Sequence, residues 1–200
     1  ELLPCAQPLV RILPGESIEL INIMAHEQQK QFVARVKRMY PEYFSGVKVI
    51  DFGSLDINGN NRIHFNDYTY TGVDIGNGNN VDVVSRAKDY NKDKDFDVVI
   101  STEMLEHDEQ YVDSLKKMHE VCREGGIIIL TAASEGRAEH GTIASDGGYS
   151  SPFTTEYYKN ITEAELREAW DFDALFSEWK IEYNRRSADI YFYGIKKALQ

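Results

Sequence analysis

The chain has 200 residues, a hydrophobic fraction of 42% and a formal net charge of −11 at pH 7. This length and composition are those of one globular domain with a sizeable core. The acidic charge argues against a surface that follows nucleic-acid phosphates. No apolar run reaches the roughly 18 residues that a membrane span needs, so we expect neither a nucleic-acid nor a membrane partner.

Two cysteines, Cys5 and Cys122, lie far apart in the sequence. They are too few for a disulfide framework and lack the spacing of a zinc site. We therefore expect free thiols in a reducing compartment, which predicts a cytoplasmic protein. The first residues also lack the basic, apolar and small-residue pattern of a secretory signal. Nothing in the sequence sets an oligomeric state.

The N-terminal part is rich in proline, with four of the five prolines within the first 41 residues. This pattern predicts an extended arm over residues 1–20. Apolar residues at helical spacing then predict a helix from about Ile23 to Tyr40, which ends before Pro41. We expect this helix to cap the sheet or to act as a lid, and we assign residues 1–45 to this arm and capping helix.

A short apolar run, Val47 to Ile50, ends at Asp51 and is followed by Gly53. Apolar runs bounded by turn residues indicate buried strands of a parallel sheet. Ligands of open α/β sheets bind outside the carboxyl ends of such strands, and a glycine there allows close approach of the backbone. Asp51 and Gly53 are therefore expected at the mouth of a ligand site.

The rest of the chain alternates predicted strands with connections, some of them helical. Further strands are predicted at Tyr68–Asp74, Val81–Val84, Phe96–Ser101, Ile127–Thr131, Trp179–Tyr183 and Ile190–Ile195. Helices are predicted from Asp108 through Cys122, before Gly125, and from the capping box of Thr162 and Glu165. The alternation favours a parallel sheet, while the last two strands are too close in sequence to be anything but an antiparallel hairpin.

Two features of the first half favour a nucleoside cofactor without a pyrophosphate. Leu55 and Asn58 stand where a dinucleotide fingerprint has its second and third glycines. Asp74 ends the second strand, 23 residues after Asp51, where a carboxylate can accept both hydroxyls of a ribose. An alternative is that Asp51 and Asp74 only accept hydrogen bonds from loop amides.

Four segments in register resemble the motifs of class I S-adenosylmethionine-dependent methyltransferases. They are Asp51–Ser54, Tyr70–Asp74, Asp97–His107 and Glu124–Leu130. The sequence around Gly53 and the later Glu139-His-Gly-Thr142 are similar to those of a little-characterised subgroup of small methyltransferases. The resemblance implies an α/β fold, a Rossmann-like three-layer sandwich with a seven-stranded, mostly parallel sheet and a reversed last strand. It makes residues 46–200 the methyltransferase domain, with an acceptor-side loop over residues 131–160.

The same resemblance implies that the cofactor is S-adenosylmethionine, with S-adenosylhomocysteine as product. The residues it assigns to cofactor binding are Asp51, Gly53, Ser54, Asp74, Ile75, Ser85, Arg86, Ala87, Ser101, Thr102 and Glu103. Asp51 is expected to hold the ammonium group and Asp74 the ribose. Ile75 is expected to pack on the adenine, and residues 101–103 to face the sulfonium.

The acceptor side is less patterned. His140, in the long loop, is the first candidate for a catalytic base, and His107 is the second, although a histidine at a helix start is often bonded to backbone. No cluster of His, Asp or Glu has a recognisable metal spacing. The motifs that methylate nucleic-acid bases are absent from the sequence, which favours a small-molecule or sugar acceptor, methylated on a hydroxyl.

Two alternative functions stay open at this point. A nicotinamide-dependent Rossmann oxidoreductase is disfavoured by the missing glycines of the dinucleotide fingerprint. The other alternative is a non-catalytic binding or assembly module on a degenerate methyltransferase fold. Leu55 and Ile57 support it, because many family members carry glycine at these positions.

Overall fold

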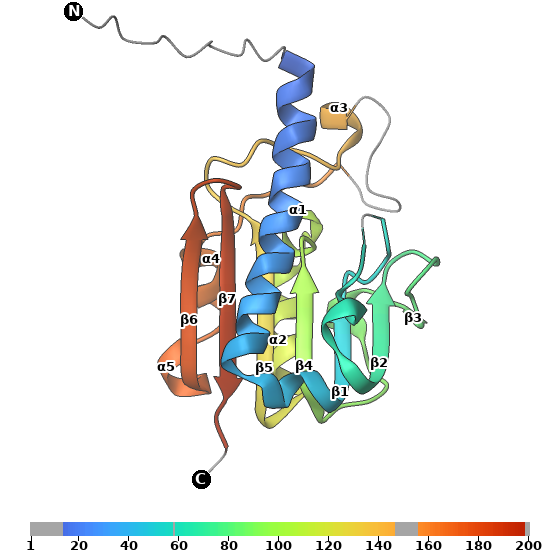
Figure 1. The fold of residues 1–200 in the computed structure, drawn as a ribbon, viewed down its shortest axis with the longest axis vertical. Coiled ribbons are helices and arrows are strands. Elements are labelled where there is room, and N and C mark those ends of the chain that lie inside the picture. The colour runs from blue at the N-terminus through green and yellow to red at the C-terminus, as the bar shows by residue number, and fades with distance from the viewer. Residues whose placement is uncertain (1–13, 58, 147–155, 199–200) are drawn as a thin grey trace, which may run out of the picture.

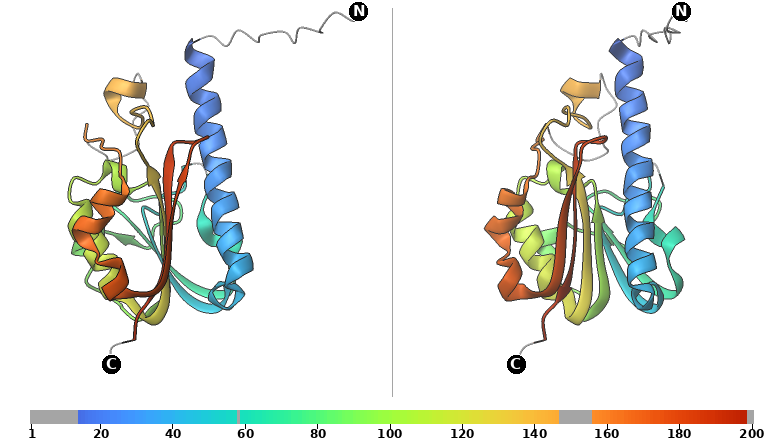
Figure 2. Two further views of the ribbon diagram at one scale, coloured as in Figure 1. Left: turned by 90° about the vertical axis from the view of Figure 1, so that its left-hand side faces the viewer. Right: turned by 60° about the vertical axis from the view of Figure 1, so that its left-hand side comes forward.

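The computed structural model describes residues 14–57, 59–146 and 156–198, with side chains described from Glu27 onward and without that of Asp146. It is a three-layer sandwich in which α1 covers one face of a central sheet, and α2, α4 and α5 cover the other (Figures 1 and 2). The strands are β1 Ser45–Phe52, β2 Asn66–Asp74, β3 Val83–Val84, β4 Phe96–Thr102, β5 Cys122–Ala133, β6 Phe176–Asn184 and β7 Asp189–Lys196. The helices are α1 Pro14–Met39, α2 Tyr111–Val121, α3 Ile143–Asp146, α4 Glu163–Ala169 and α5 Phe172–Leu175, with 3-10 turns η1 Pro41–Phe44, η2 Asn61–His64, η3 Ala87–Asp89 and η4 Leu105–His107.

The seven strands lie in the order β3-β2-β1-β4-β5-β7-β6. β7 runs antiparallel to both β5 and β6, whereas the other neighbouring strands pair in parallel. The short connection between β6 and β7 leaves no room for a crossover, which forces this reversal. The predicted seven-stranded, mostly parallel sheet with a reversed last strand is confirmed.

The central strands are apolar on both faces because a helical layer covers each of them. Along these strands, alternate residues enter opposite layers. Val49, Val98 and Ile129 pack with α1, and Ile50, Val99 and Ile128 pack with the layer of α2 and α4. All six side chains are fully buried. Both faces of the sheet are therefore covered, and the carboxyl edge is where ligands of open α/β sheets bind.

Helix α1 is longer than the sequence predicts. It begins at Pro14, not Ile23, so residues 14–20 of the predicted arm are helical, and residues 1–13 lie outside the described part. Proline is tolerated in the first turn of a helix, because the backbone N–H groups of that turn form no hydrogen bond within the helix. The C-terminal half packs on the sheet through Phe32, Val33 and Val36. The N-terminal half rises past the carboxyl edge (Figures 1 and 2).

Helix α2 is shorter than predicted at both ends. It begins at Tyr111, not Asp108, and the Asp108 carboxylate accepts instead from the Gln110 N–H in the preceding turn. It ends at Val121, so Cys122 opens β5 and does not extend the helix. The glycines that follow lie within β5, where Gly125 takes a φ of +67°. The assumption that they stop the helix is therefore wrong.

The start of α4 follows the sequence prediction, whereas α5 was not predicted. Thr162 and Glu165 form the predicted capping box at the start of α4. Trp170, just after this helix, is buried and donates its indole N–H to the Leu115 carbonyl at 3.1 Å, which ties the end of α4 to α2. In the described part of the chain, no helix has the length and apolarity needed to cross a membrane.

Candidate active site

Asp51 lies at the end of β1 and is buried, with 1% of its surface exposed. Its Oδ2 atom accepts hydrogen bonds from the Tyr70 hydroxyl at 2.6 Å and from the Asn61 amide at 3.2 Å. Its Oδ1 atom is buried and has no partner among the described residues. Burial raises the pKa of Asp51 to about 7, although both hydrogen bonds oppose this shift.

An unpartnered carboxylate oxygen at this edge suits an ammonium group, which provides both the missing donor and the opposite charge. The two donors on Oδ2 were not expected from the sequence, since Asn61 lies in a stretch without periodicity and Tyr70 reads as an ordinary strand residue. Asn61 also contacts the Thr102 hydroxyl at 3.2 Å, which links the ends of β1 and β4. Thr102 and Asp51 therefore share Asn61 as a hydrogen-bond partner.

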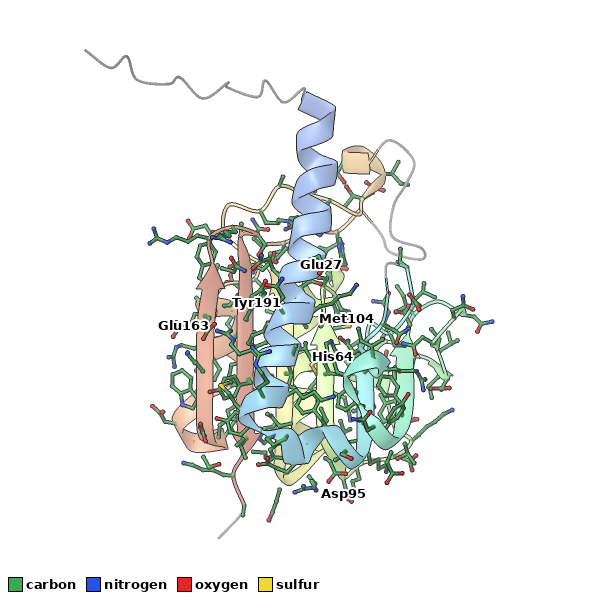
Figure 3. All side chains as sticks on the ribbon, viewed as in Figure 1. Glu27, His64, Asp95, Met104, Glu163 and Tyr191 are labelled. Carbon is green, nitrogen blue, oxygen red and sulfur yellow. The ribbon has the colours of Figure 1, made fainter. Side chains whose placement is uncertain are left out.

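Gly53 and Ser54 turn the chain away from β1. The amides of both residues donate to the Val73 carbonyl, at 2.9 Å and 3.2 Å. Gly53 has a φ of +82°, and a Cβ on it would lie 2.6 Å from the Cβ of Met104, at the carboxyl edge of the sheet (Figure 3). The glycine is therefore needed for its left-handed turn and for the approach of Met104. Because the amides of Gly53 and Ser54 already donate to β2, they are not available as hydrogen-bond donors to a cofactor.

Asp74, at the end of β2, accepts the Leu55 N–H on one oxygen at 3.1 Å and the Gly76 N–H on the other at 3.0 Å. This is the loop-amide arrangement that stood as the alternative to ribose binding. The two roles are compatible, because each carboxylate oxygen carries two lone pairs and has used one. The amides fix the carboxylate at the edge, where its remaining lone pairs can accept hydroxyl groups.

The loop after β1 is fastened to the loop after β2. The Asn80 amide donates to the Ser54 carbonyl at 2.8 Å, and the Asp56 N–H donates to the Asn79 carbonyl at 3.1 Å. Leu55 packs so closely on Gly78 that a Cβ there would lie 2.4 Å from its Cδ1 atom. Leu55 therefore replaces the usual glycine with a packing contact, whereas Ile57 is 54% exposed.

The predicted adenine-side residues are divided between surface and core. Ile75 is 40% exposed next to Asp74, as an apolar platform for a base must be. Ser85 continues from β3 and donates its backbone N–H to the Asp74 carbonyl at 2.8 Å, and Arg86 is exposed. Ala87 is buried in the core cluster, so its side chain serves packing. The first three residues lie along one edge of the site.

At the end of β4, Ser101 and Glu103 differ from one another. The Ser101 side chain is fully buried and donates to the Phe52 carbonyl at 2.8 Å, so it holds β4 to β1 and does not face the site. Glu103 has a φ of +54°, a conformation that residues other than glycine rarely adopt and that is typical of functional turns. Its carboxylate accepts the Thr131 hydroxyl at 3.1 Å.

Glu103, which is partly exposed, lies beside a group of buried charges that the sequence did not reveal. Glu106 on η4 and Asp189 at the start of β7 are both fully buried. The Arg137 guanidinium is 3.5 Å from the Asp189 carboxylate and donates to the Ser187 carbonyl at 2.7 Å. Burial, together with the Glu106 and Asp189 carboxylates, raises the pKa of Glu103 well above its usual range. Arg137 acts in the opposite direction.

The two candidate bases meet beside this group of charges. The rings of His107 and His140 are 5.4 Å apart, and each packs edge-on against Tyr158. The His140 Nε2 atom is 3.9 Å from a Glu106 oxygen, and its Nδ1 atom contacts the Ala138 carbonyl at 3.1 Å. Burial lowers the pKa of His140, so the neutral ring is favoured. The His107 Nδ1 atom is buried without a partner among the described residues, so the expected bond to backbone is not formed there.

The arrangement as a whole has two adjoining parts along the carboxyl edge. One part, around Asp51, Asp74 and Ile75, offers two carboxylates and an exposed apolar side chain. The other part, around His107 and His140, offers imidazoles and buried charges. A cationic, ribose-containing cofactor fits the first part, and an acceptor that must lose a proton fits the second.

Known structures share this fold at low sequence identity. The 1,6-didemethyltoxoflavin-N1-methyltransferase of Burkholderia thailandensis, with bound 1,6-didemethyltoxoflavin and S-adenosylhomocysteine, aligns with a TM-score of 0.57 and 17% identity over 98% of this chain and 94% of that one. A possible histamine N-methyltransferase of Thermotoga maritima aligns with a TM-score of 0.59 and 16% identity, over 92% and 94%. Phosphoethanolamine N-methyltransferase 2 of Haemonchus contortus aligns with a TM-score of 0.59 and 15% identity, over 92% of this chain and 58% of that one.

At these identities the likeness concerns the fold. No curated protein matches the sequence. Residues 24–179, which are most of the chain, match the family model of a methyltransferase domain, and this match removes the nicotinamide-dependent alternative. With the strand order, the acids that end β1 and β2 and the four motifs in register, it establishes that the chain belongs to the class I S-adenosylmethionine-dependent methyltransferases.

Proposed function

We propose that this protein transfers a methyl group from S-adenosylmethionine to a hydroxyl group of a small-molecule or saccharide acceptor. The observation that carries the proposal is the contact between His140 and the buried Glu106, beside the end of β4. A neutral imidazole next to a buried carboxylate is a competent general base, because the carboxylate stabilises the imidazolium that forms. Hydroxyl acceptors need such a base.

The proposed reaction is an in-line displacement. S-adenosylmethionine, when bound, would supply the methyl group on a sulfonium, whose sulfur would keep the electron pair of the S–CH₃ bond while the acceptor oxygen takes the methyl group. His140 takes the hydroxyl proton on Nε2, because its Nδ1 atom carries a proton toward the Ala138 carbonyl. The residues of the site thus have to align the acceptor and hold one proton.

We assign cofactor binding to residues whose side chains can accept further hydrogen bonds or offer an exposed apolar surface. Oδ1 of Asp51 would bind the ammonium group, and the free lone pairs of Asp74 would accept the ribose hydroxyls. Ile75 would pack on the adenine, with Ser85 and Arg86 along its edge. Thr102 and Glu103, at the end of β4, would lie nearest the reacting methyl group.

The acceptor side is assigned to the segments that surround this edge. We propose that residues 131–160 and α1 form the acceptor pocket, within a methyltransferase domain that follows the capping helix. Of this range, residues 131–133 end β5, and residues 147–155 lie outside the described part of the chain. The support is positional, since α1 and α3 both rise past the carboxyl edge of the sheet (Figure 2). A cytoplasmic location is kept as a prediction from the cysteine content.

The test is an assay of S-adenosylhomocysteine release with matched panels of hydroxyl and amine acceptors. We expect turnover with a hydroxyl acceptor and a loss of about 10²–10⁴-fold in kcat for His140→Gln. Binding of S-adenosylhomocysteine, measured by calorimetry, should be unchanged. His119→Gln is the control, because His119 is another partly buried histidine whose pKa burial lowers, to about 4. Methylation of amines alone, or a fully active His140→Gln, would contradict the proposal. Cofactor binding without turnover on either panel would favour the binding-module alternative.

A further inference from the structure

Three potential metal ligands converge where the two candidate bases lie. Glu106 and His107 end η4, directly after β4, and His140 comes from the loop after β5. One ligand atom from each residue lies within 4.8 Å of the other two. The ligands come from two separate segments, His107 and His140 being 33 residues apart, so no short spacing in the sequence announces them.

Glu106 gives independent support for a bound cation. Its side chain is fully buried, and neither carboxylate oxygen has a hydrogen-bond partner among the described residues. An ionised carboxylate is costly to bury unless a positive charge compensates it. Arg137 also faces the fully buried Asp189, so its charge serves more than one carboxyl group. A cation bound to Glu106 would supply both the partner and the charge that its carboxylate oxygens lack.

The geometry of His140 is that of a metal ligand. Histidines that bind metals generally donate their other ring N–H to a carbonyl or a carboxylate. His140 makes such a contact from Nδ1 to the Ala138 carbonyl, which leaves the lone pair of Nε2 directed at Glu106. The same carbonyl accepts the Tyr158 hydroxyl at 3.2 Å, and the Tyr158 ring packs on both histidines. This outer shell fixes the ring in place.

We propose that Glu106, His107 and His140 form a divalent transition-metal site that leaves coordination positions open. Two imidazoles and one carboxylate favour Zn²⁺, Mn²⁺ or Fe²⁺ over Mg²⁺ and Ca²⁺, which prefer oxygen ligands. Neighbouring ligands of a tetrahedral ion at about 2.1 Å lie about 3.4 Å apart, so side-chain rotations that bring the three ligand atoms about 1 Å closer together would close the site.

The consequence for chemistry rests on the proposed function. An ion at an open site beside the end of β4 would lower the pKa of a coordinated acceptor hydroxyl, which can then lose its proton to solvent at neutral pH. The acceptor would accordingly be a hydroxyl compound that coordinates the metal. With an ion on its Nε2 atom, His140 would hold the ion in place of the acceptor proton, so it would act as the base of the proposed function only in the metal-free chain. In both states the loss of His140 would lower kcat.

Metal binding is tested directly, without acceptor or turnover. The chain is freed of metal with a chelator and titrated with ZnCl₂ against a chromophoric zinc indicator, and with MnCl₂ by electron paramagnetic resonance. We expect one equivalent of each metal to bind, and at least a tenfold weaker affinity for Glu106→Gln and for His140→Ala. MgCl₂ should not compete at equal concentration. His119→Ala is the control, since this partly buried histidine lies outside the cluster and should leave the affinity unchanged.

Two results would overturn the proposal. One is the absence of bound metal in a wild-type sample whose circular dichroism shows a folded chain. The other is equal affinity in the wild type, Glu106→Gln and His140→Ala, which would place any bound ion elsewhere. Calorimetry with S-adenosylmethionine on the same samples keeps the two proposals apart. Cofactor binding without metal binding would overturn only the metal site, and failure to bind the cofactor would overturn the proposed function.

Discussion

The Tyr70 hydroxyl donates to Oδ2 of Asp51 at 2.6 Å, while Oδ1 of the same carboxylate is buried without a partner among the described residues. One oxygen is thus fixed in place by the protein, and the other is left without a donor among the described residues. Because β1 and β2 are adjacent parallel strands, Tyr70 reaches across from its own strand to the end of β1. The sheet itself positions the donor.

We predict that Asp51→Asn weakens the binding of S-adenosylmethionine by about 10–100-fold, because a hydrogen bond to a charged group contributes about 1.5–3 kcal/mol. Calorimetric titration measures the affinity. Asp113→Asn, which replaces an exposed carboxylate in the first turn of α2, should bind as the wild type does. Equal affinities for Asp51→Asn and the wild type would remove Asp51 from the cofactor site.

The same carboxylate should make stability depend on pH. Burial raises the pKa of Asp51 to about 7 in the folded protein, whereas the unfolded chain releases this proton near its ordinary pKa of about 3.9. Between these values the folded state binds more protons, so stability falls as the pH rises. The cost at pH 8 is on the order of 4 kcal/mol and falls below about 1 kcal/mol at pH 4.

Asp51→Asn cannot lose this proton, so its free energy of unfolding should gain on the wild type as the pH rises from 4 to 7, and the gain should level off above pH 8. Urea unfolding at several pH values measures the difference. For Asp113→Asn we expect no such trend. A difference between Asp51→Asn and the wild type that does not change with pH would show that Asp51 is ionised throughout.

The sheet could be predicted from the sequence because its causes are local. A short apolar run bounded by turn residues, such as Val47–Ile50, favours a buried parallel strand. The short link between β6 and β7 allows only a hairpin. The bounds of α2 could not be predicted, because an aspartate such as Asp108 and a glycine such as Gly125 are found in turns and strands as well as at helix ends. Asp108 serves the turn before the helix, and Gly125 turns the chain inside β5.

The candidate site divides in the same way. Asp51 and Asp74 were found because each ends a strand, and the ends of parallel strands share one edge. Asn61 and Tyr70 were missed, since their role arises only when β2 lies beside β1. The buried Glu106 was missed because a glutamate at a helix start is usually exposed, and only the packing of η4 shows that it has no partner.

Gly53 and Gly46 can be compared to measure how much an added side chain destabilises the protein at each position. Both take positive φ angles, +82° and +69°, but a Cβ on Gly46 meets nothing within 4 Å, whereas one on Gly53 meets Met104 at 2.6 Å. We predict that Gly46→Ala costs about 1–2 kcal/mol for the backbone conformation alone. Gly53→Ala should cost more and should also weaken cofactor binding. Urea unfolding and calorimetry measure the two effects, and equal costs would mean that Met104 moves aside freely.

Arg137 is expected to stabilise the fold far more than an exposed cation does. It is 5% exposed and faces the fully buried Asp189, whereas Arg167 and Glu163 form an ion pair on the surface of α4. We predict that Arg137→Met costs about 3–5 kcal/mol at pH 8, because it leaves a buried carboxylate without its cation. Glu163→Gln should cost less than about 1 kcal/mol.

The loss in Arg137→Met should shrink at low pH. Burial raises the pKa of Asp189 to about 6, so at pH 5 this carboxyl group is largely protonated in the folded protein and has little need of the guanidinium. Urea unfolding of both variants at pH 5 and pH 8 checks the pattern. A cost for Arg137→Met that is the same at both values would show that Arg137 acts through its packing and its hydrogen bond to Ser187, and not through its charge.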